Sequence, residues 1–130
     1  AAVEASPDHW AARNNLAALL LETRRHREGL AQLEELRRRG MTFPGSYMSL
    51  AEAYVATGQP EEARGALSEY VREHPDRAAG YENLGMFELV QGRLEAAVEA
   101  FDKAVALAPT ESLQAQQGRI VARALVLESS

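Results

Sequence analysis

The residues best able to do chemistry in this sequence are its histidines and its neighbouring pairs of carboxylates. The histidines are isolated and lack the spacing of metal ligands: His9, His26 and His74. Adjacent carboxylates, as in Glu34-Glu35 and Glu61-Glu62, do not face each other on a helix. The chain has no cysteine, no glycine-rich phosphate loop and no Ser/His/Asp arrangement at a supporting spacing. The sequence therefore predicts no catalytic site, no metal site and no cofactor.

Two runs of arginines could contact an anionic partner. The first, residues 24–27, occupies a predicted turn between helices, whereas the second, residues 37–39, ends a predicted helix. Basic residues at a helix C-terminus complement its dipole, so we assign the second run a structural role. The candidate surface for an anionic partner is therefore Arg24, Arg25 and Arg27. A solvated run of charge is the alternative interpretation of these three residues.

The composition is that of a water-soluble globular protein, with 130 residues, 46% hydrophobic and 25% charged. A net charge of −5 argues against nucleic acid as a partner, because nucleic-acid binders need a basic face. No apolar run is long enough to span a bilayer, and the first residues do not resemble a signal peptide. Lys103 is the only lysine beside many arginines, an association that favours a GC-rich bacterial source.

The sequence repeats itself every 34 residues. A shift by this period aligns 47–51 with 81–85 and 58–63 with 92–97. A further step back places Leu16-Ala17 under Leu50-Ala51. The repeats run 10–43, 44–77 and 78–111 without insertion. A fixed period over three copies is typical of stacked helical units.

Each repeat is predicted to form two antiparallel helices, so the fold class is all-α. In the third repeat Asp76 is the expected N-cap of the first helix, and Gly92 is expected to end that helix. The second helix stops at Pro109, which cannot continue it. In the middle repeat Pro60 fits the first position of the second helix.

The pattern resembles the tetratricopeptide repeat (TPR) family over 102 of the 130 residues. The third repeat matches it at Tyr81, Leu84, Gly85, Ala97, Phe101, Ala104 and Pro109, and departs from it at Glu88. The second repeat matches at Tyr47, Leu50, Ala51, Tyr54, Ala63 and Pro75, and the first repeat is the most divergent. The resemblance implies a right-handed superhelical solenoid of antiparallel helix pairs.

Small residues recur where the helices of a pair should cross closely, because a larger side chain would push the two axes apart. The predicted facing pairs are Ala17 with Gly29, Ala51 with Ala63, and Gly85 with Ala97. We therefore expect a leucine at position 85 or 97 to destabilise the fold strongly.

The two ends differ from the repeats between them. Residues 1–7 mimic 104–109, the end of a second helix, which predicts that 1–9 are the tail of a preceding repeat in a longer array. At the other end Thr110 can cap a helix from Glu111 to about Leu127. Its apolar residues are Leu113, Ile120, Val121, Ala124 and Leu125. Because Arg119 holds the aligned small position, we interpret 112–130 as a C-terminal capping helix or a partial fourth repeat that does not pack as a true repeat.

The resemblance also implies a ligand-binding concave face, lined by the first helix of each pair. Carried over by position, its residues are Asn14, Asn15, Ala18, Leu21, Glu22, Met48, Ser49, Glu52, Val55, Glu82, Asn83, Met86 and Leu89. None is basic, so the clamp by which chaperone-binding members hold a C-terminal carboxylate is absent, and Hsp70- or Hsp90-type tails are not expected ligands. An amphipathic helix or extended segment with apolar anchors suits adaptable methionines. The alternative is that the leucines and valine only contact the following repeat.

Three hypotheses of function follow. The first is a protein–protein interaction scaffold, not an enzyme, that holds a partner segment on the concave face. The second is a structural spacer in a longer solenoid without a ligand of its own, and the third is self-association through exposed ends of the helix pairs. The family resemblance favours a bacterial assembly in secretion, pilus assembly or exopolysaccharide export, in the periplasm rather than the cytoplasm, without insertion of this segment into the membrane.

Overall fold

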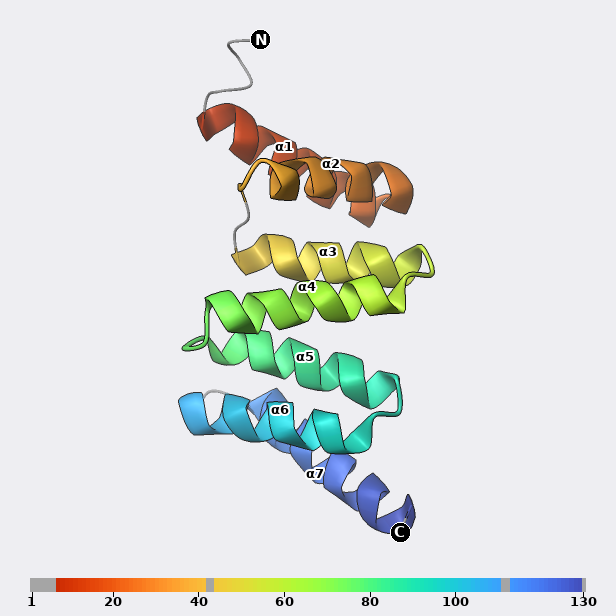
Figure 1. The fold of residues 1–130 in the computed structure, drawn as a ribbon, viewed down its shortest axis with the longest axis vertical. Helices are drawn as coiled ribbons and strands as arrows, with labels where there is room; N and C mark the ends of the chain where they lie inside the picture. Colours follow the sequence, from red (N-terminus) through yellow and green to blue (C-terminus); the bar gives the residue numbers. More distant parts are fainter. Residues whose placement is uncertain (1–6, 42–43, 111–112, 130) are drawn as a thin grey trace. The chain divides into compact units, whose positions relative to one another are not determined.

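The computed structural model describes residues 7–41, 44–110 and 113–129, with side chains from Trp10 onward. These residues form seven helices and no strand, which confirms the predicted all-α fold (Figure 1). The helices are α1 (Pro7–Glu22), α2 (His26–Arg38), α3 (Pro44–Ala56), α4 (Pro60–Glu73), α5 (Ala78–Val90), α6 (Leu94–Leu107) and α7 (Leu113–Ser129). The chain divides into two compact units, Ala1–Ala66 and Leu67–Ser130, which are described separately below. Most of the predicted N-terminal tail lies outside the described residues, as do the side chain of His9 and the predicted start of the last helix at Glu111.

The repeat period is visible in the starts of the helices. The second helices begin at His26, Pro60 and Leu94, so each starts 34 residues after the previous one. Pro60 opens α4, as predicted, because its missing N–H is not needed in a first turn. The expected N-cap at Asp76 is wrong, because a backbone hydrogen bond from Arg77 N–H to His74 O closes a turn that places Arg77 at the cap.

In the first unit, α1 and α2 run in opposite directions and α2 packs on α3 (Figure 1). The glycine of α2 makes this close approach possible, since a Cβ on Gly29 would lie 3.2 Å from the carbonyl oxygen of Ala17. Ala17 itself is fully buried, which agrees with the predicted pairing of these two small residues. The core is then filled by large side chains on α2 and α3, chiefly Leu33, Leu36, Tyr47 and Leu50.

One polar contact joins α2 and α3 at the edge of this core. The Tyr54 hydroxyl donates a hydrogen bond to the Glu34 carboxylate over 2.9 Å. Burial of the ring, followed by the nearby Glu34 carboxylate, raises the pKa of Tyr54 above its usual value of 10.0. The hydroxyl therefore keeps its proton and stays a donor throughout the neutral range.

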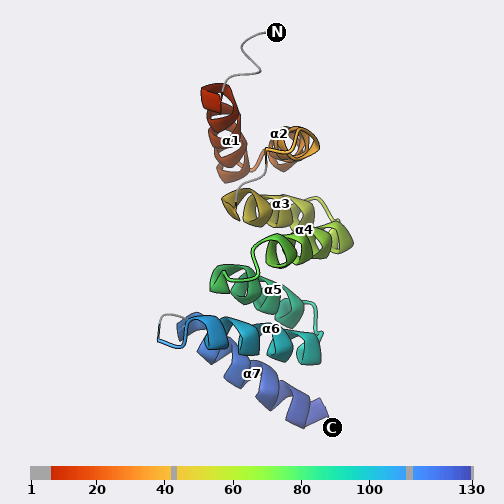
Figure 2. The same ribbon diagram turned by 60° about the vertical axis from the view of Figure 1, so that its left-hand side comes forward.

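In the second unit, α6 lies between α5 and α7, and Figures 1 and 2 both show α6 and α7 side by side. Phe101 of α6 is fully buried at the centre of the packing. Two glycines make room for its ring: a Cβ on Gly85 would lie 2.7 Å from Cε1, and one on Gly118 would lie 2.5 Å from Cζ. Both glycines are therefore required by the position of one aromatic side chain.

The terminal helix α7 packs through its small residues rather than its large ones. Its buried residues are Ala115, Gly118 and Ala122, which stand 34 residues after Tyr81, Leu84 and Glu88. Arg119 does not hold the helix away, because its guanidinium lies at the edge, 3.5 Å from the Asp102 carboxylate. The large apolar residues that the sequence pattern singled out are exposed instead: Leu113, Ile120, Val121 and Leu125. The contact between α7 and the rest of the unit is thus close and built on small side chains.

Candidate functional site

The predicted binding face in the first unit is formed by α1 and α3. These helices touch where the Ser46 hydroxyl donates a hydrogen bond to the Asn14 side-chain oxygen over 3.3 Å. Asn14 is half-buried by this contact, so its amide helps to hold the two helices together. The asparagine therefore has a structural role at the edge of the face.

The surface of this face is apolar with acidic neighbours. Met48 is 39% exposed and Val55 49% exposed, and their spacing of seven positions, about two helical turns, places both side chains on one stripe of α3. Glu52 is exposed between them on the same helix. Other predicted members that are exposed or half-buried here are Asn15, Ala18, Glu22 and Ser49. The first unit thus presents two apolar side chains beside carboxylates.

Leu21 was predicted to lie on this face, and that prediction is wrong. Its side chain is buried, and its Cδ2 atom is only 3.0 Å from where a Cβ on Gly29 would lie. Because glycine leaves space on α2, Leu21 fills that space and packs inside the hairpin. It is a core residue.

In the second unit, α5 contributes less open surface than the sequence predicts. Met86 and Leu89 are partly buried and pack against a cluster that contains Phe101, Ala115 and Ala122. Both side chains are therefore partly used for packing with α6 and α7, and their part in binding a ligand stays a prediction. Glu82 and Asn83 remain half-buried, and the Asn83 amide donates to the carbonyl oxygen of Ala79 over 2.7 Å.

The predicted anionic-partner surface lies beside a hollow of about 440 Å³ in the first unit. Its lining consists of Arg24, Arg25, His26, Arg27 and Glu28 from the turn between α1 and α2, with Ala56 and Thr57 from the end of α3. The sequence singled out the arginines but gave no sign of the α3 wall, because no pattern predicts how close the end of α3 comes to this turn. We call this feature the basic hollow.

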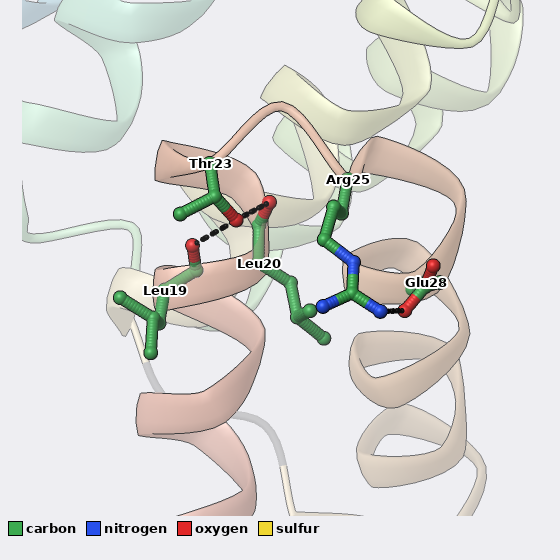
Figure 3. A network of polar contacts seen from close by, with 5 residues as sticks. All are labelled: Leu19, Leu20, Thr23, Arg25 and Glu28. Atoms are coloured by element: carbon green, nitrogen blue, oxygen red, sulfur yellow. Dashed lines mark hydrogen bonds and ion pairs between the residues drawn. The ribbon is translucent and has the colours of Figure 1, made fainter.

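The turn that forms the basic hollow has a fixed backbone geometry. The Thr23 hydroxyl donates to the carbonyl oxygens of Leu19 and Leu20 over 2.9 and 3.1 Å, which satisfies the end of α1 (Figure 3). Arg24 then adopts a left-handed conformation with a φ of 63°. The Arg25 guanidinium is paired with the Glu28 carboxylate on the first turn of α2 (Figure 3).

The second arginine run is used differently. Arg38 and Arg39 both pair with Glu35, and the Arg39 guanidinium also lies 5.5 Å from the centre of the Trp10 ring. Trp10 is buried, and the guanidinium of Arg13 on the same helix lies 5.6 Å from the centre of its ring. These contacts agree with the structural role predicted for residues 37–39.

The second unit contains an apolar hollow that the sequence did not predict. It has a volume of about 360 Å³ and is lined by Glu95, Val98, Arg123, Val126 and Leu127. One of its lining residues, Leu127, is among the exposed apolar residues of α7. Size and hydropathy alone suggested that these residues would be buried, so the sequence contained no signal for an open surface here. The hypothesis of self-association through exposed ends of the helix pairs stays a prediction.

Within the described ranges, no three histidine, acidic or cysteine side chains are grouped so that they could hold a metal ion. In the same part of the chain, no helix combines the length and the apolar character needed to cross a membrane.

Comparisons with known proteins agree with this architecture. A family model described as tetratricopeptide repeat matches residues 1–46 and 48–112. A comparison with curated proteins gives no match.

Several solved structures are similar in fold. The type III secretion chaperone SycD of Yersinia enterocolitica, in complex with a peptide of the translocator YopD, has a TM-score of 0.82 and 15% identity over 98% of this chain and 99% of that one. The Sgt2 TPR domain from Aspergillus fumigatus has a TM-score of 0.82 and 16% identity, covering 95% and 82% of the two chains. The first TPR of Spaghetti, bound to the HSP90 peptide SRMEEVD, has a TM-score of 0.79 and 13% identity, covering 91% and 93%. At these identities the likeness shows a common fold.

Proposed function

We propose, from the premise that the chain belongs to the tetratricopeptide-repeat family, that it is a protein–protein interaction scaffold. Its ligand is a segment of a partner protein, an amphipathic helix or an extended peptide, that binds along the first helices of the pairs. The family membership confirms the resemblance seen in the sequence, and the superhelical twist stays a prediction.

The observation that supports this function most directly is the exposed stripe on α3. Met48 and Val55 have large apolar side chains of the kind that is usually buried, yet both are exposed to solvent beside Glu52. Methionine and valine on a helix face can receive the apolar anchors of a peptide, and the carboxylate favours a basic residue in that peptide. The proposed ligand therefore has apolar anchors at helical or alternating spacing with a lysine or arginine nearby.

Similar structures support the proposal through what they hold. SycD was solved with a peptide of the translocator YopD, and Spaghetti with an HSP90 peptide, so this fold can hold peptides. The face described above has carboxylates and no basic side chain, which favours a ligand unlike the acidic SRMEEVD peptide.

A matched pair of variants tests the proposal. Met48→Glu with Val55→Glu replaces the two exposed apolar residues of the face. Leu16→Glu with Leu107→Glu makes the same chemical change at residues that are 45% and 43% exposed and lie outside the predicted face. Peptides selected from a random phage-displayed library on the wild-type chain are then measured on both variants, with helicity as the control for folding.

We expect the selected peptides to be apolar and basic. Their affinity should fall by about tenfold or more on the face variant and stay within about twofold on the control variant, since an apolar anchor contributes on the order of 1–3 kcal/mol. Equal binding to both variants would reject the face. A library that yields no binder would favour the spacer hypothesis, because a spacer needs no ligand.

We further propose a bacterial setting, in an assembly for envelope export or secretion, with the periplasm as the compartment. The arginine-rich composition with Lys103 as the only lysine supports a bacterial source. Fractionation of the source cells with an antibody to this chain tests the compartment. Recovery of the protein with cytoplasmic markers would contradict it.

A further inference from the structure

We infer that the basic hollow binds an acidic peptide segment of a partner protein, as a second contact away from the first-helix face. This inference rests on the proposed function only in taking the ligand to be part of a protein. The hollow is about 440 Å³, within the size range of sites that receive small ligands or a few side chains. Its residues all lie in the first unit.

Two arginines of the hollow have charge available for a ligand. Arg24 and Arg27 are exposed, and neither forms an ion pair within the described part of the chain. Arg25 is different, because the Glu28 carboxylate already holds it (Figure 3). A guanidinium without an internal carboxylate can receive an external one, often through two parallel hydrogen bonds.

The contrast with residues 37–39 shows that unpaired arginines are not general in this repeat. There, Glu35 accepts from Arg38 and Arg39, and the Trp10 ring lies against Arg39. Side chains of the same chain thus bind the charges of the second run. Among the described residues, no such partner accounts for the charges of Arg24 and Arg27.

The backbone at Arg24 adds a further reason to look for a ligand. Its φ is 63°, and the residues 34 and 68 places later, Gly58 and Gly92, have φ values of 77° and 79°. All three N–H groups donate to the carbonyl three residues earlier, over 3.1 Å in each case. Two repeats therefore fill this left-handed position with glycine, which has no steric cost there, whereas the first repeat uses arginine. A strained residue in the wall of a charged hollow points to a role for its side chain.

A histidine completes the polar lining. His26 lines the hollow, and its Nδ1 atom is buried without a hydrogen-bond partner among the described residues. Such a nitrogen can donate to or accept from a bound group. The opposite wall, Ala56 and Thr57, offers small side chains that leave room for one.

A short acidic peptide fits these features better than a longer polyanion. Glu22 and Glu28 flank the arginines in sequence, and the chain as a whole has a net charge of −5. An extended nucleic acid or an anionic membrane would bring many negative charges close to the acidic side chains of this chain, which would repel them. A peptide with one or two carboxylates would contact the hollow alone.

The experiment uses the whole chain and a fluorescein-labelled peptide of consecutive glutamates between serine and glycine residues. The test variant is Arg24→Gln with Arg27→Gln. The matched control is Arg72→Gln with Arg77→Gln, which removes the same charge from exposed arginines that, within the described residues, have no ion pair. A glutamine version of the peptide, an oligothymidylate and phosphatidylserine vesicles are the comparison ligands.

We expect the glutamate peptide to bind the wild type and the control equally and to bind the test variant about tenfold more weakly, because each of the two lost surface ion pairs should weaken binding by about threefold. Amide shifts in the wild type should centre on residues 24–28 and 56–57. Equal weakening in the control, or equal binding of the glutamine peptide, would overturn the inference. Preferential binding of the oligonucleotide or the vesicles through the same arginines would also overturn it.

The failure of this inference is distinguishable from failure of the proposed function. The Met48→Glu and Val55→Glu variant leaves the basic hollow intact and should bind the glutamate peptide normally. If that peptide fails on every form while library peptides still require the α3 stripe, the acidic contact is rejected and the scaffold function stands.

Discussion

The helix pairs α1–α2 and α5–α6 occupy equivalent places in the repeat and solve the same packing problem with glycines on opposite helices. In the first pair the glycine is Gly29 on the second helix, and its nearest side chain is the flexible Leu21. In the other pair it is Gly85 on the first helix, against the ring of the fully buried Phe101. This difference shows that the close crossing of two helices in a pair needs a small residue, and that either helix can supply it.

The largest expected effect is at Gly85. A leucine there must displace Phe101, so we predict a loss of more than about 3 kcal/mol in the free energy of unfolding, measured by urea denaturation. Gly65→Leu is the control, because a Cβ at Gly65 in α4 meets nothing within 4 Å. Comparable losses in both variants would show that a leucine side chain is costly at any glycine of these helices, and that the Phe101 ring does not set the cost.

The same ring makes a smaller substitution costly on α7. We predict that Gly118→Ala lowers the free energy of unfolding by about 2 kcal/mol, since the clash with Phe101 exceeds the gain of about 1 kcal/mol in helix propensity. Phe101→Leu shortens the side chain that an alanine at position 118 would clash with. In the Phe101→Leu background, Gly118→Ala should therefore cost less stability than it does in the wild type. A double-mutant cycle measures this coupling, and strict additivity would contradict the predicted contact.

Arg24 and Gly92 occupy the same left-handed turn position in two repeats, so the two residue types can be exchanged. Arg24→Gly should stabilise the chain by up to about 1 kcal/mol, because relief of the left-handed strain exceeds the entropy that glycine adds to the unfolded state. Gly92→Arg should lower the free energy of unfolding by about the same amount. Thermal melts of both variants test the pair, and an unstable Arg24→Gly variant would mean that the arginine side chain stabilises the turn. If the basic hollow binds acidic peptides, the stabilised variant should also bind them more weakly.

The smallest effect is expected at Gly29. An alanine Cβ would lie 3.0 Å from Leu21 Cδ2 and 3.2 Å from the Ala17 carbonyl oxygen, so a small shift can accommodate it. The gain in helix propensity offsets this cost, and we predict a net change within about 1 kcal/mol by urea denaturation. A loss as large as that of Gly118→Ala would mean that the first pair is as tightly constrained as α6–α7.

The sequence predicted the elements of the fold well because each depends on local rules. The period of 34, Pro60 at a helix start and Gly92 at a helix end all follow from backbone chemistry, and all appear in the structure. The family resemblance extended this to the pairing of the helices. The turn position of Arg24 was also predicted.

The sequence predicted the site less well because exposure depends on what lies opposite each side chain. Leu21 turned inward because Gly29 left space, and Leu89 packs with residues of α6 and α7. On α7 a rule based on hydropathy selected large residues such as Ile120, whereas close packing against Phe101 required Gly118. Hydropathy ranks side chains by size and polarity, and a tight helix crossing favours the smallest of them.

The burial of Trp10 gives the chain an optical reporter for one of its two units. It is the single tryptophan of the sequence, and it lies in the first unit beside the guanidinium groups of Arg13 and Arg39. Its emission therefore follows the melting of α1 and α2, whereas circular dichroism at 222 nm, roughly the wavelength of helical absorption, follows all seven described helices. Superimposed curves from the two signals would mean one cooperative transition, and separated curves would mean that the units melt in turn, as repeat proteins with weak coupling do.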